Sequence, residues 1–254
     1  MRALLLAAGL GTRLRPLTDT VPKCLVPVGG RPLLDLWLEQ LDRAGIDDVL
    51  VNLHYLPGVV SDHLSTRPPR AGLRVHTVLE PKLLGTGGTL LRNRPFFAGD
   101  AVMMIHADNV SVFDMAAFMG AYERRDEGIE MTMMTFRTDA PQSCGIVEVD
   151  ARGRVQAFHE KVAAPPGNLA NAAVYIVSRR VVDFMAGLGK EVVDFSTEVI
   201  PAFLGRIGTF ENDIYHRDIG TLESFEAAQH EYPLALAKFA ADEATRRTTG
   251  GERA

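Results

Sequence analysis

Cysteine is scarce in this chain, with only two among 254 residues. Cys24 and Cys144 match no metal-binding or redox spacing, and two cysteines cannot supply the disulfide framework typical of small secreted proteins. The sequence therefore excludes a fold that depends on several disulfides. The scarcity fits a reducing compartment, and we expect a cytoplasmic protein.

Long apolar runs and a strong charge of one sign are also missing. No segment approaches the ~20 apolar residues that a membrane span needs, and the apolar run at 4–8 is shorter than the core of a signal peptide. We therefore expect neither a membrane anchor nor a cleaved leader. A net charge of -5 with 23% charged residues is typical neither of a non-specific nucleic-acid binder nor of a polybasic membrane-surface protein. Any anionic ligand must be met by a few local cations.

Apolar residues, by contrast, make up 46% of the chain, enough to bury one sizeable core. In the first third, apolar runs of strand length alternate with stretches of helical period. The expected strands are 3–7, 49–53 and 73–79, and the expected helices are 32–44 and 58–64. This alternation predicts an α/β fold of Rossmann type, with a mixed, mainly parallel sheet flanked by helices.

The pattern changes in the second half of the chain, where 145–149 and 155–158 alternate like a β-hairpin. We therefore expect a small β-rich substrate lobe within about 140–215. The other expected elements are strands at 101–105, 131–136 and 172–177, helices at 115–125, after Ser178 and at 196–204, a last strand ending at Asp218, and a final helix ending near His230. Together they predict a single domain over 1–235 and a partly frayed tail over 236–254.

The first expected strand leads into a turn of small residues that is suited to a phosphate chain. Gly9 and Gly11 let backbone N–H groups approach phosphate oxygens closely. The turn is not a Walker A loop, because no Lys-Ser/Thr pair follows the glycines. Leu14 stands where the dinucleotide-binding fingerprint needs its third glycine, which argues against a dehydrogenase. A plain tight turn is the alternative interpretation.

Two cations lie near this turn in the sequence. Arg13 offers a forked guanidinium and Lys23 a point charge, and both groups bind phosphate oxygens. The motif LAAGLGTRL at 6–14, followed by PK at 22–23 and VPV at 26–28, resembles the signature of the sugar-1-phosphate nucleotidyltransferases, also called NDP-sugar pyrophosphorylases. This resemblance implies that Arg13 and Lys23 are catalytic residues.

The resemblance covers about residues 1–231 and includes EPKLLGTGG at 80–88, which is similar to the family's base-binding segment. Glu80 can accept from both N1–H and N2–H₂ of guanine, whereas uracil and thymine each offer only one such donor. A solvated loop carboxylate is the alternative interpretation of Glu80. The nucleotide-binding residues implied by the resemblance are Leu6, Ala8, Gly9, Gly11, Thr12, Glu80, Gly85, Thr86 and Gly87.

Two aspartates are expected at strand ends, Asp108 in HADN at 106–109 and Asp218 in RDIGT at 217–221. Open α/β sheets bind ligands at the carboxyl ends of their strands. By resemblance, both aspartates are ligands of Mg²⁺, which prefers hard oxygen ligands and keeps waters, so that two carboxylates and substrate phosphates suffice. Either aspartate taken alone is better interpreted as a cap or loop residue.

The motifs GIVEV, FHEK and NAAVY, which begin at 145, 158 and 171, resemble the sugar-phosphate side of the family site. The resemblance implies that Glu160 bonds sugar hydroxyls and that Lys161, the third catalytic residue, holds the sugar-linked phosphate. An exposed Glu160–Lys161 ion pair of little energetic worth is the alternative. The sugar-phosphate-binding residues implied by the resemblance are Asn109, Gly145, Glu160 and Asn171.

Two departures from the family pattern concern the sugar side. Ala107 and Ala172 stand where many relatives carry glycine, and we expect their methyl groups to narrow the sugar pocket. The seven histidines show neither metal-ligand spacing nor a partner for a nucleophilic triad. We interpret them as structural or surface residues, with His106 and His159 adjacent to motif residues that would contact a ligand.

The implied reaction is attack by an oxygen of a sugar 1-phosphate on the α-phosphorus of a nucleoside triphosphate, with release of pyrophosphate. The nucleophile is already ionised, so catalysis consists of orientation and charge neutralisation. Overall similarity to mannose-1-phosphate and heptose-1-phosphate guanylyltransferases favours GTP. Uridylyl or thymidylyl transfer to a hexose 1-phosphate and a non-catalytic nucleotide-sugar-binding regulator stay open, as does a homo-oligomer.

Overall fold

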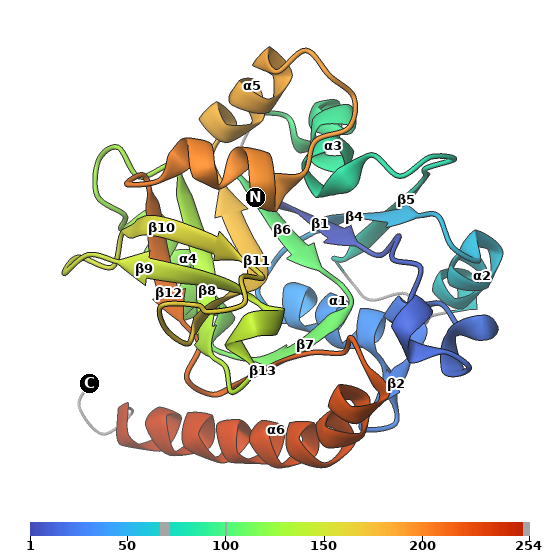
Figure 1. The fold of residues 1–254 in the computed structure, drawn as a ribbon. Helices are drawn as coiled ribbons and strands as arrows, with labels where there is room; N and C mark the ends of the chain where they lie inside the picture. The colour runs from blue at the N-terminus through green and yellow to red at the C-terminus, as the bar shows by residue number, and fades with distance from the viewer. Residues whose placement is uncertain (67–71, 100, 251–254) are drawn as a thin grey trace.

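The computed structural model describes residues 1–66, 72–99 and 101–250. Its centre is a nine-stranded sheet in the order β10-β9-β11-β6-β1-β4-β5, with β8 paired to β11 and β12 paired to β8 (Figure 1). Its strands are β1 Arg2–Leu6, β4 Asp48–Leu53, β5 Arg74–Leu79, β6 Val102–His106, β8 Met131–Arg137, β9 Gly145–Val149, β10 Val155–Glu160, β11 Leu169–Val177 and β12 Ile207–Glu211. Strands β5, β4, β1 and β6 are parallel, and β11 lies antiparallel to β6. The predicted mixed sheet flanked by helices is confirmed.

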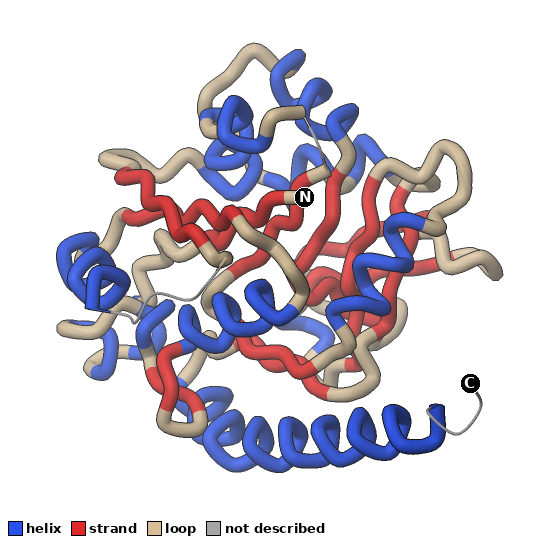
Figure 2. The backbone as a smooth tube through the Cα atoms, turned by 180° about the vertical axis from the view of Figure 1, so that it is seen from behind, coloured by secondary structure: helices blue, strands red, loops and turns tan. Residues whose placement is uncertain are grey.

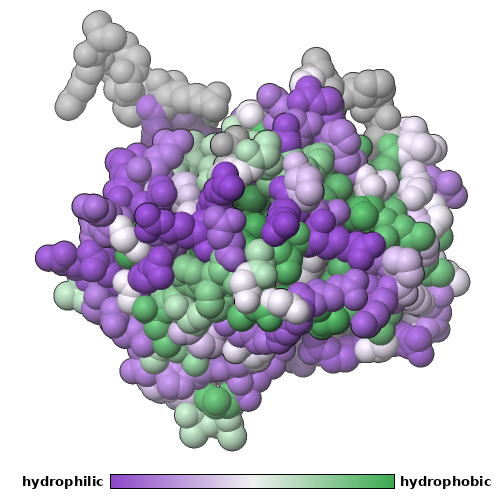
Figure 3. Space-filling view, turned by 90° about the horizontal axis from the view of Figure 1, so that it is seen from above, coloured by the Kyte–Doolittle hydropathy of each residue, from purple (hydrophilic) through white to green (hydrophobic). Residues whose placement is uncertain are grey.

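Helices cover both faces of this sheet (Figure 2). The α-helices are α1 Leu33–Arg43, α2 Pro57–Thr66, α3 Gly85–Arg92, α4 Met115–Glu123, α5 Arg179–Gly187 and α6 Leu222–Gly250. The shorter turns are the 3₁₀ segments η1 Thr12–Leu14, η2 Leu17–Asp19, η3 Lys23–Leu25, η4 Arg94–Phe97, η5 Pro141–Ser143 and η7 Pro201–Phe203, and the π segment η6 Phe195–Val199. Among the described residues, no helix is both long enough and apolar enough to cross a bilayer. On the face seen in Figure 3, hydrophobic residues gather in patches between hydrophilic ones.

The alternation of side chains along β1 explains the two cores. Successive residues of a strand point to opposite faces. Ala3 and Leu5 therefore pack with α1, α2 and α4 on one face, whereas Leu4 and Leu6 pack with α3 and α5 on the other. The carboxyl ends of the four parallel strands consequently lie between two fixed layers of helices.

A second, smaller structure lies beside the main sheet. Strands β7 (Asn109–Val112) and β13 (Tyr215–Asp218) form an antiparallel ribbon, and β2 (Pro27–Val28) pairs with β3 (Arg31–Pro32). Helix α6 packs on the β7–β13 ribbon through a third apolar cluster that contains Ala228 and Tyr232. Asp218 therefore ends a strand of this ribbon, rather than a strand of the open sheet as expected.

Two expectations about local structure are wrong, and the structure gives the location of a third expected feature, the β-rich lobe. The final helix does not end near His230 but continues as α6 to Gly250, with Pro233 inside it, while residues 251–254 of the expected tail lie outside the described residues. The expected helix at 196–204 is a π turn followed by a 3₁₀ turn, because Pro201 has no N–H for a helical hydrogen bond. The expected β-rich lobe is the antiparallel end of the main sheet, where β9 pairs with β10.

The glycines at 85–88 begin helix α3 and allow it to lie against the segment around Val193. The N–H groups of Gly87 and Gly88 both donate to the carbonyl of Val193, at 3.0 and 3.1 Å. A Cβ on Gly85 would lie 2.5 Å from that carbonyl oxygen, and one on Gly88 would lie 2.5 Å from the carbonyl oxygen of Glu191. Close backbone packing therefore requires glycine here.

Replacing Gly88 by alanine tests this packing, with Gly58→Ala in α2 as the matched control. Both changes improve helix propensity, but only Gly88→Ala meets backbone, since a Cβ on Gly58 has no neighbour within 4 Å. We expect Gly88→Ala to lower the free energy of unfolding by about 1–3 kcal/mol and Gly58→Ala to raise it by roughly 0.5–1 kcal/mol. Urea denaturation measures both, and equal effects would contradict the packing account.

Candidate active site

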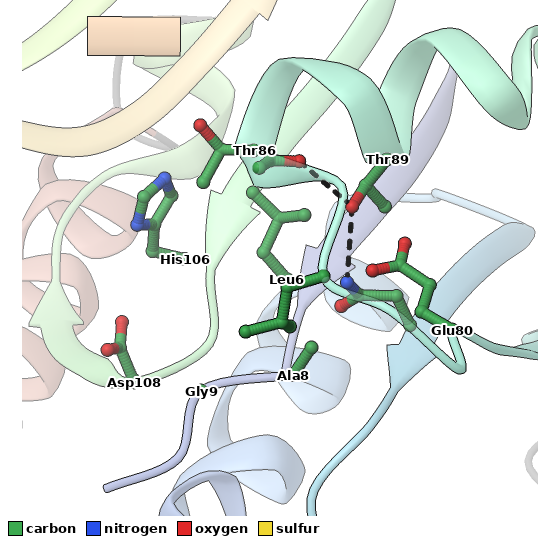
Figure 4. A pocket seen from close by; sticks show the side chains of 11 residues that line it. Leu6, Ala8, Gly9, Glu80, Thr86, Thr89, His106 and Asp108 are labelled. Carbon is green, nitrogen blue, oxygen red and sulfur yellow. Dashed lines mark hydrogen bonds between the residues drawn. The ribbon is translucent and has the colours of Figure 1, made fainter. Parts of the chain in front are cut away.

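A pocket of about 270 Å³ opens at the carboxyl ends of β1, β4 and β6 (Figure 4). Its lining residues are Leu6, Ala8, Gly9, Asn52, Glu80, Leu83, Gly85, Thr86, Thr89, His106 and Asp108. Six of the nine nucleotide-binding residues implied by the sequence resemblance are in this set, together with Asp108. In the view of Figure 4, Glu80 lies at the opposite end of the pocket from Asp108, so each end carries a carboxylate.

Asn52 and Thr89 belong to the pocket but were not identified from the sequence. The Asn52 Oδ1 accepts from the backbone N–H of Ala7 at 2.7 Å, and its Nδ2 donates to the Thr89 hydroxyl at 3.4 Å. That hydroxyl in turn donates to the carbonyl of Gly85 at 3.2 Å (Figure 4). These bonds connect β1, β4 and α3. Asn52 could have been identified from the sequence, because it lies near the carboxyl end of the strand expected at 49–53.

The turn after β1 folds back onto the stem of Lys23. Gly11 has φ +64°, and a Cβ there would lie 2.9 Å from Thr18 Cγ2 and 3.3 Å from Lys23 Cβ. The Thr18 hydroxyl donates to the carbonyl of Gly11 at 2.7 Å. Thr12 follows, exposed, at the start of η1. Gly11 therefore acts by shaping the loop, because only glycine fits both this backbone angle and this contact.

Lys23 brings the two predicted metal ligands together. Its Nζ lies 2.8 Å from Asp108 Oδ2 and 3.4 Å from Asp218 Oδ1, although the three residues come from distant parts of the chain. The lysine side chain is 7% exposed, whereas that of Asp218 is 57% exposed. One face of the carboxylate pair is thus held by the protein and the other is open to a ligand.

The titration of groups near Asp108 is set by this arrangement. Burial raises the pKa of Asp108, but the nearby charges, that of Lys23 foremost, and the hydrogen bonds to the carboxylate together outweigh it, so the pKa is lowered and the group is a carboxylate. Burial lowers the pKa of His106 below its usual value and lowers that of His216 to about 3. His216 instead shares a hydrogen bond of 2.6 Å with the Ser111 hydroxyl. These imidazoles are neutral at neutral pH.

Arg13 lies next to Asp218 at the rim of this cluster. A Cβ on Gly220 would be 3.1 Å from Arg13 Nη2 and 2.6 Å from Asp218 Oδ2, so Gly220 leaves room for both groups. No carboxylate within the described ranges forms an ion pair with Arg13. Its exposed guanidinium is therefore available to an anionic ligand.

The donor set fits a magnesium ion. Asp108 and Asp218 provide hard oxygen ligands that already converge on one cation, the ammonium of Lys23. The described part of the chain contains no group of three or more His, Cys, Asp or Glu side chains that could hold a metal. Two carboxylates suffice for Mg²⁺ when phosphates and waters complete its octahedron, but not for a closed structural zinc site.

Three of the residues expected on the sugar side lie at the start of β9, at the end of β10 and directly after β10. Gly145 lies under the Phe158 ring, where a Cβ would approach ring carbons at 2.5 Å and Glu160 Oε2 at 2.8 Å. Lys161 Nζ lies 3.4 Å from Glu160 Oε1, and its backbone has φ +50°. Lys161 is 63% exposed. This geometry is compatible with both the phosphate-binding role and the surface ion pair considered above.

Two asparagines expected to contact the sugar also form hydrogen bonds within the protein, and their contact with a sugar stays a prediction. Asn171 Nδ2 donates to the Tyr175 hydroxyl at 2.6 Å and its Oδ1 accepts from the N–H of Ala173 at 3.0 Å. Asn109 is 3% exposed and its Nδ2 donates to the carbonyl of Ala172 at 3.1 Å. Both asparagines support the irregular turn of β11, where the register shifts after Asn171. We therefore assign them a supporting role in this arrangement.

Two further placements differ from expectation. Ala107 and Ala172 are both 0% exposed and belong to the main core, so their methyl groups do not narrow a sugar pocket. Gly87 is outside the pocket lining, and a Cβ there would lie 2.8 Å from Val193 Cγ1. Gly87 therefore lies on the side of α3 that packs against Val193.

A pocket at the carboxyl ends of parallel strands, with a glycine turn, a buried lysine and two convergent carboxylates beside it, defines a nucleotide-binding α/β protein equipped to hold phosphate groups. A family model described as "Nucleotidyl transferase" matches residues 2–233. The chain belongs to this family.

Several relatives carry names that specify a sugar and a base. A protein of Mycobacterium tuberculosis (strain ATCC 25618 / H37Rv) named mannose-1-phosphate guanylyltransferase is 34% identical over 227 residues, which are 88% of this chain and 62% of the relative. A probable mannose-1-phosphate guanylyltransferase 1 of Oryza sativa subsp. japonica is 33% identical over 72% of this chain and 51% of its own length. The chain thus spans about half to three fifths of these relatives.

Solved structures share the fold at lower identity. A putative glucose-1-phosphate thymidylyltransferase from Bacillus anthracis, in complex with a sucrose, superimposes with a TM-score of 0.79 at 21% identity, covering 90% of this chain and 94% of that one. HddC from Yersinia pseudotuberculosis complexed with GMP-PN gives 0.76 at 23% identity, covering 91% and 99%. At these identities, the likeness establishes the fold alone.

Asp108→Asn tests the carboxylate pair. The change keeps the shape of the side chain but removes its charge, and we expect Mn²⁺ binding to weaken and any metal-dependent turnover to fall roughly 10²–10³-fold, the scale of losing one electrostatic contact in such a site. Asp213→Asn, an exposed residue five positions before Asp218, is the control. Unchanged Mn²⁺ binding and turnover in Asp108→Asn would rule out the metal role.

Proposed function

We propose that this chain transfers the guanylyl group of GTP to a hexose 1-phosphate of the mannose type, releasing pyrophosphate and requiring Mg²⁺. Membership of the nucleotidyltransferase family supports the reaction class. Relatives named mannose-1-phosphate guanylyltransferases, at 28–34% identity, favour this base and sugar. The observation that carries the proposal is that Glu80, a carboxylate in the pocket, is buried without a hydrogen-bond donor among the described residues.

Glu80 is 2% exposed, and neither of its carboxylate oxygens has a hydrogen-bond partner among the residues that the structure describes. A buried acceptor without a donor is costly, so such a group is expected to meet one in a ligand. Two buried acceptors on one carboxylate at an end of the pocket match the N1–H and N2–H₂ donors of guanine. Adenine, uracil and cytosine do not present that pair of adjacent donors on one edge.

The charged end of the pocket suits the triphosphate. With the base at Glu80, the phosphates would extend along Gly9 and Gly11 towards Lys23 and Arg13. These two cations would orient the α-phosphate and neutralise charge that develops on the leaving pyrophosphate. Lys161 would hold the phosphate of the incoming sugar, whose oxygen is already ionised. In-line attack then requires orientation of the two anions and no general base.

Asp108 and Asp218 would hold the magnesium ion. When bound, the ion supplies positive charge to the phosphate oxygens and so lowers the repulsion between two anionic substrates. Lys23 then has two tasks: it holds the carboxylates in place and binds phosphate. This division explains how a protein with a net charge of -5 can accept two polyanions at one place.

The proposal is tested by incubating the chain with Mg²⁺, each common nucleoside triphosphate and a panel of hexose and heptose 1-phosphates, and measuring pyrophosphate. We expect release with GTP and mannose 1-phosphate. Release only with a heptose 1-phosphate would revise the sugar, and release only with UTP or dTTP would overturn the base. If no pair of substrates releases pyrophosphate, a regulatory, nucleotide-sugar-binding role is favoured.

Glu80→Gln tests guanine recognition. The amide replaces one acceptor by a donor, which faces the guanine donors unfavourably, so kcat/KM for GTP should fall roughly 10- to 100-fold, the range for losing a bidentate base contact. ITP lacks the 2-amino group, and the preference for GTP over ITP should disappear in the variant. The control is Glu127→Gln, which changes an exposed carboxylate. A preserved GTP preference in Glu80→Gln would exclude this contact.

A further inference from the structure

Helix α6 contacts two segments that position the cluster of Lys23, Asp108 and Asp218. One is the segment that follows Lys23, and the other is strand β13. Gln229 Nε2 donates to the carbonyl of Pro27 at 2.6 Å, and the N–H of Gly29 donates to Gln229 Oε1 at 3.2 Å. Pro27 and Gly29 follow shortly after Lys23 in the chain. Two residues further along the helix, Glu231 accepts from both Arg217 Nε and Arg217 Nη2, each at 2.7 Å. Figure 1 shows α6 along the β7–β13 ribbon.

Arg217 and Asp218 are neighbours on β13 and point to opposite faces, as successive strand residues do. Arg217 faces α6 and binds Glu231, whereas Asp218 faces Lys23, whose Nζ lies 3.4 Å from Asp218 Oδ1. Tyr215, two residues earlier, also faces α6, with its ring 6.4 Å from that of Tyr232. A rotation of β13 about its axis would therefore move Asp218 and break the Arg217 contact together.

The Arg217–Glu231 pair is suited to fix orientation. Both oxygens of one carboxylate meet two nitrogens of one guanidinium, a geometry that a lysine or a single hydrogen bond cannot reproduce. The side chains are 33% and 40% exposed, and ion pairs at such exposure contribute little to the free energy of unfolding. The pair therefore mainly fixes the orientation of β13 and contributes little to the stability of the fold.

The ribbon needs such a constraint because it lies outside the main sheet. Asp108 follows β6, which is hydrogen-bonded on both sides, to β1 and β11. β13 pairs with β7 alone among the described strands. Without a contact from its other side, Asp218 would be the least constrained member of the charged cluster.

We propose that Glu231, acting through Arg217, is a positioning residue for Asp218, and that α6 is thereby part of the machinery of the site. This inference rests on the proposed role of Asp218 as a metal ligand. Glu231 itself touches no reacting group. Gln229 acts in parallel on the segment that follows Lys23, so that one turn of α6 sets the spacing of lysine and aspartate.

The test measures Mn²⁺ binding by the loss of the free-ion EPR signal, using the full chain and Glu231→Gln. We expect the variant to bind Mn²⁺ roughly 10-fold more weakly, as for other residues that support metal ligands, with little change in urea denaturation. Arg217→Lys keeps the charge but loses the fork, and should show the same direction. Glu226→Gln, an exposed carboxylate on the same helix, is the control and should bind as the unaltered chain does.

A double-variant cycle separates positioning from a general effect. If Glu231 acts through Asp218, adding Glu231→Gln to Asp218→Asn should weaken Mn²⁺ binding no further. Additive weakening, an equal effect of Glu226→Gln, or loss of unfolding free energy with unchanged Mn²⁺ affinity would each overturn the inference. If the unaltered chain binds no Mn²⁺, the metal role of Asp218 falls with it. If Mn²⁺ binding depends on Glu231 but no pyrophosphate is released, only the proposed reaction fails.

Discussion

The site depends on one interaction, the contact of the Lys23 ammonium with the carboxylates of Asp108 and Asp218. Two carboxylates at close range repel each other, and the buried ammonium that contacts both offsets this repulsion. The three residues reach this point by separate routes: a loop folded around Gly11, the end of β6, and a ribbon held by α6. The site requires all three segments, because each supplies one of the three charged groups.

The rest of the pocket follows from this charged end. Its opposite end carries Glu80, a buried carboxylate that accepts no hydrogen bond from the described part of the chain. The hydrogen bonds of Asn52 hold the walls between the two ends. The proposed function therefore gives the pocket a fixed polarity, with acceptors for a base at one end and phosphate-binding groups at the other. A nucleotide that satisfies both ends has one orientation, which points its phosphates towards the open face of the carboxylate pair.

Much of this arrangement could be predicted from the sequence, because the deciding signals are local. The period of apolar residues predicts the α/β order, and the glycine turn and the strand-end position of Asp108 indicate where ligands bind. Contacts between distant segments could not be predicted. The partners of Asn109, the backbone that Gly87 and Gly88 face, and the extension of α6 past Pro233 all depend on tertiary packing, which overrides local propensity.

The central claim is that Asp108 and Asp218 form a cation site at the phosphate end of a guanine nucleotide pocket. Its most direct test is anomalous diffraction from crystals of the chain grown with Mn²⁺ and a non-hydrolysable GTP analogue. The account predicts an anomalous peak contacting both carboxylates and the analogue's phosphates, with guanine at Glu80. A peak elsewhere, or a nucleotide whose base lies away from Glu80, would contradict it.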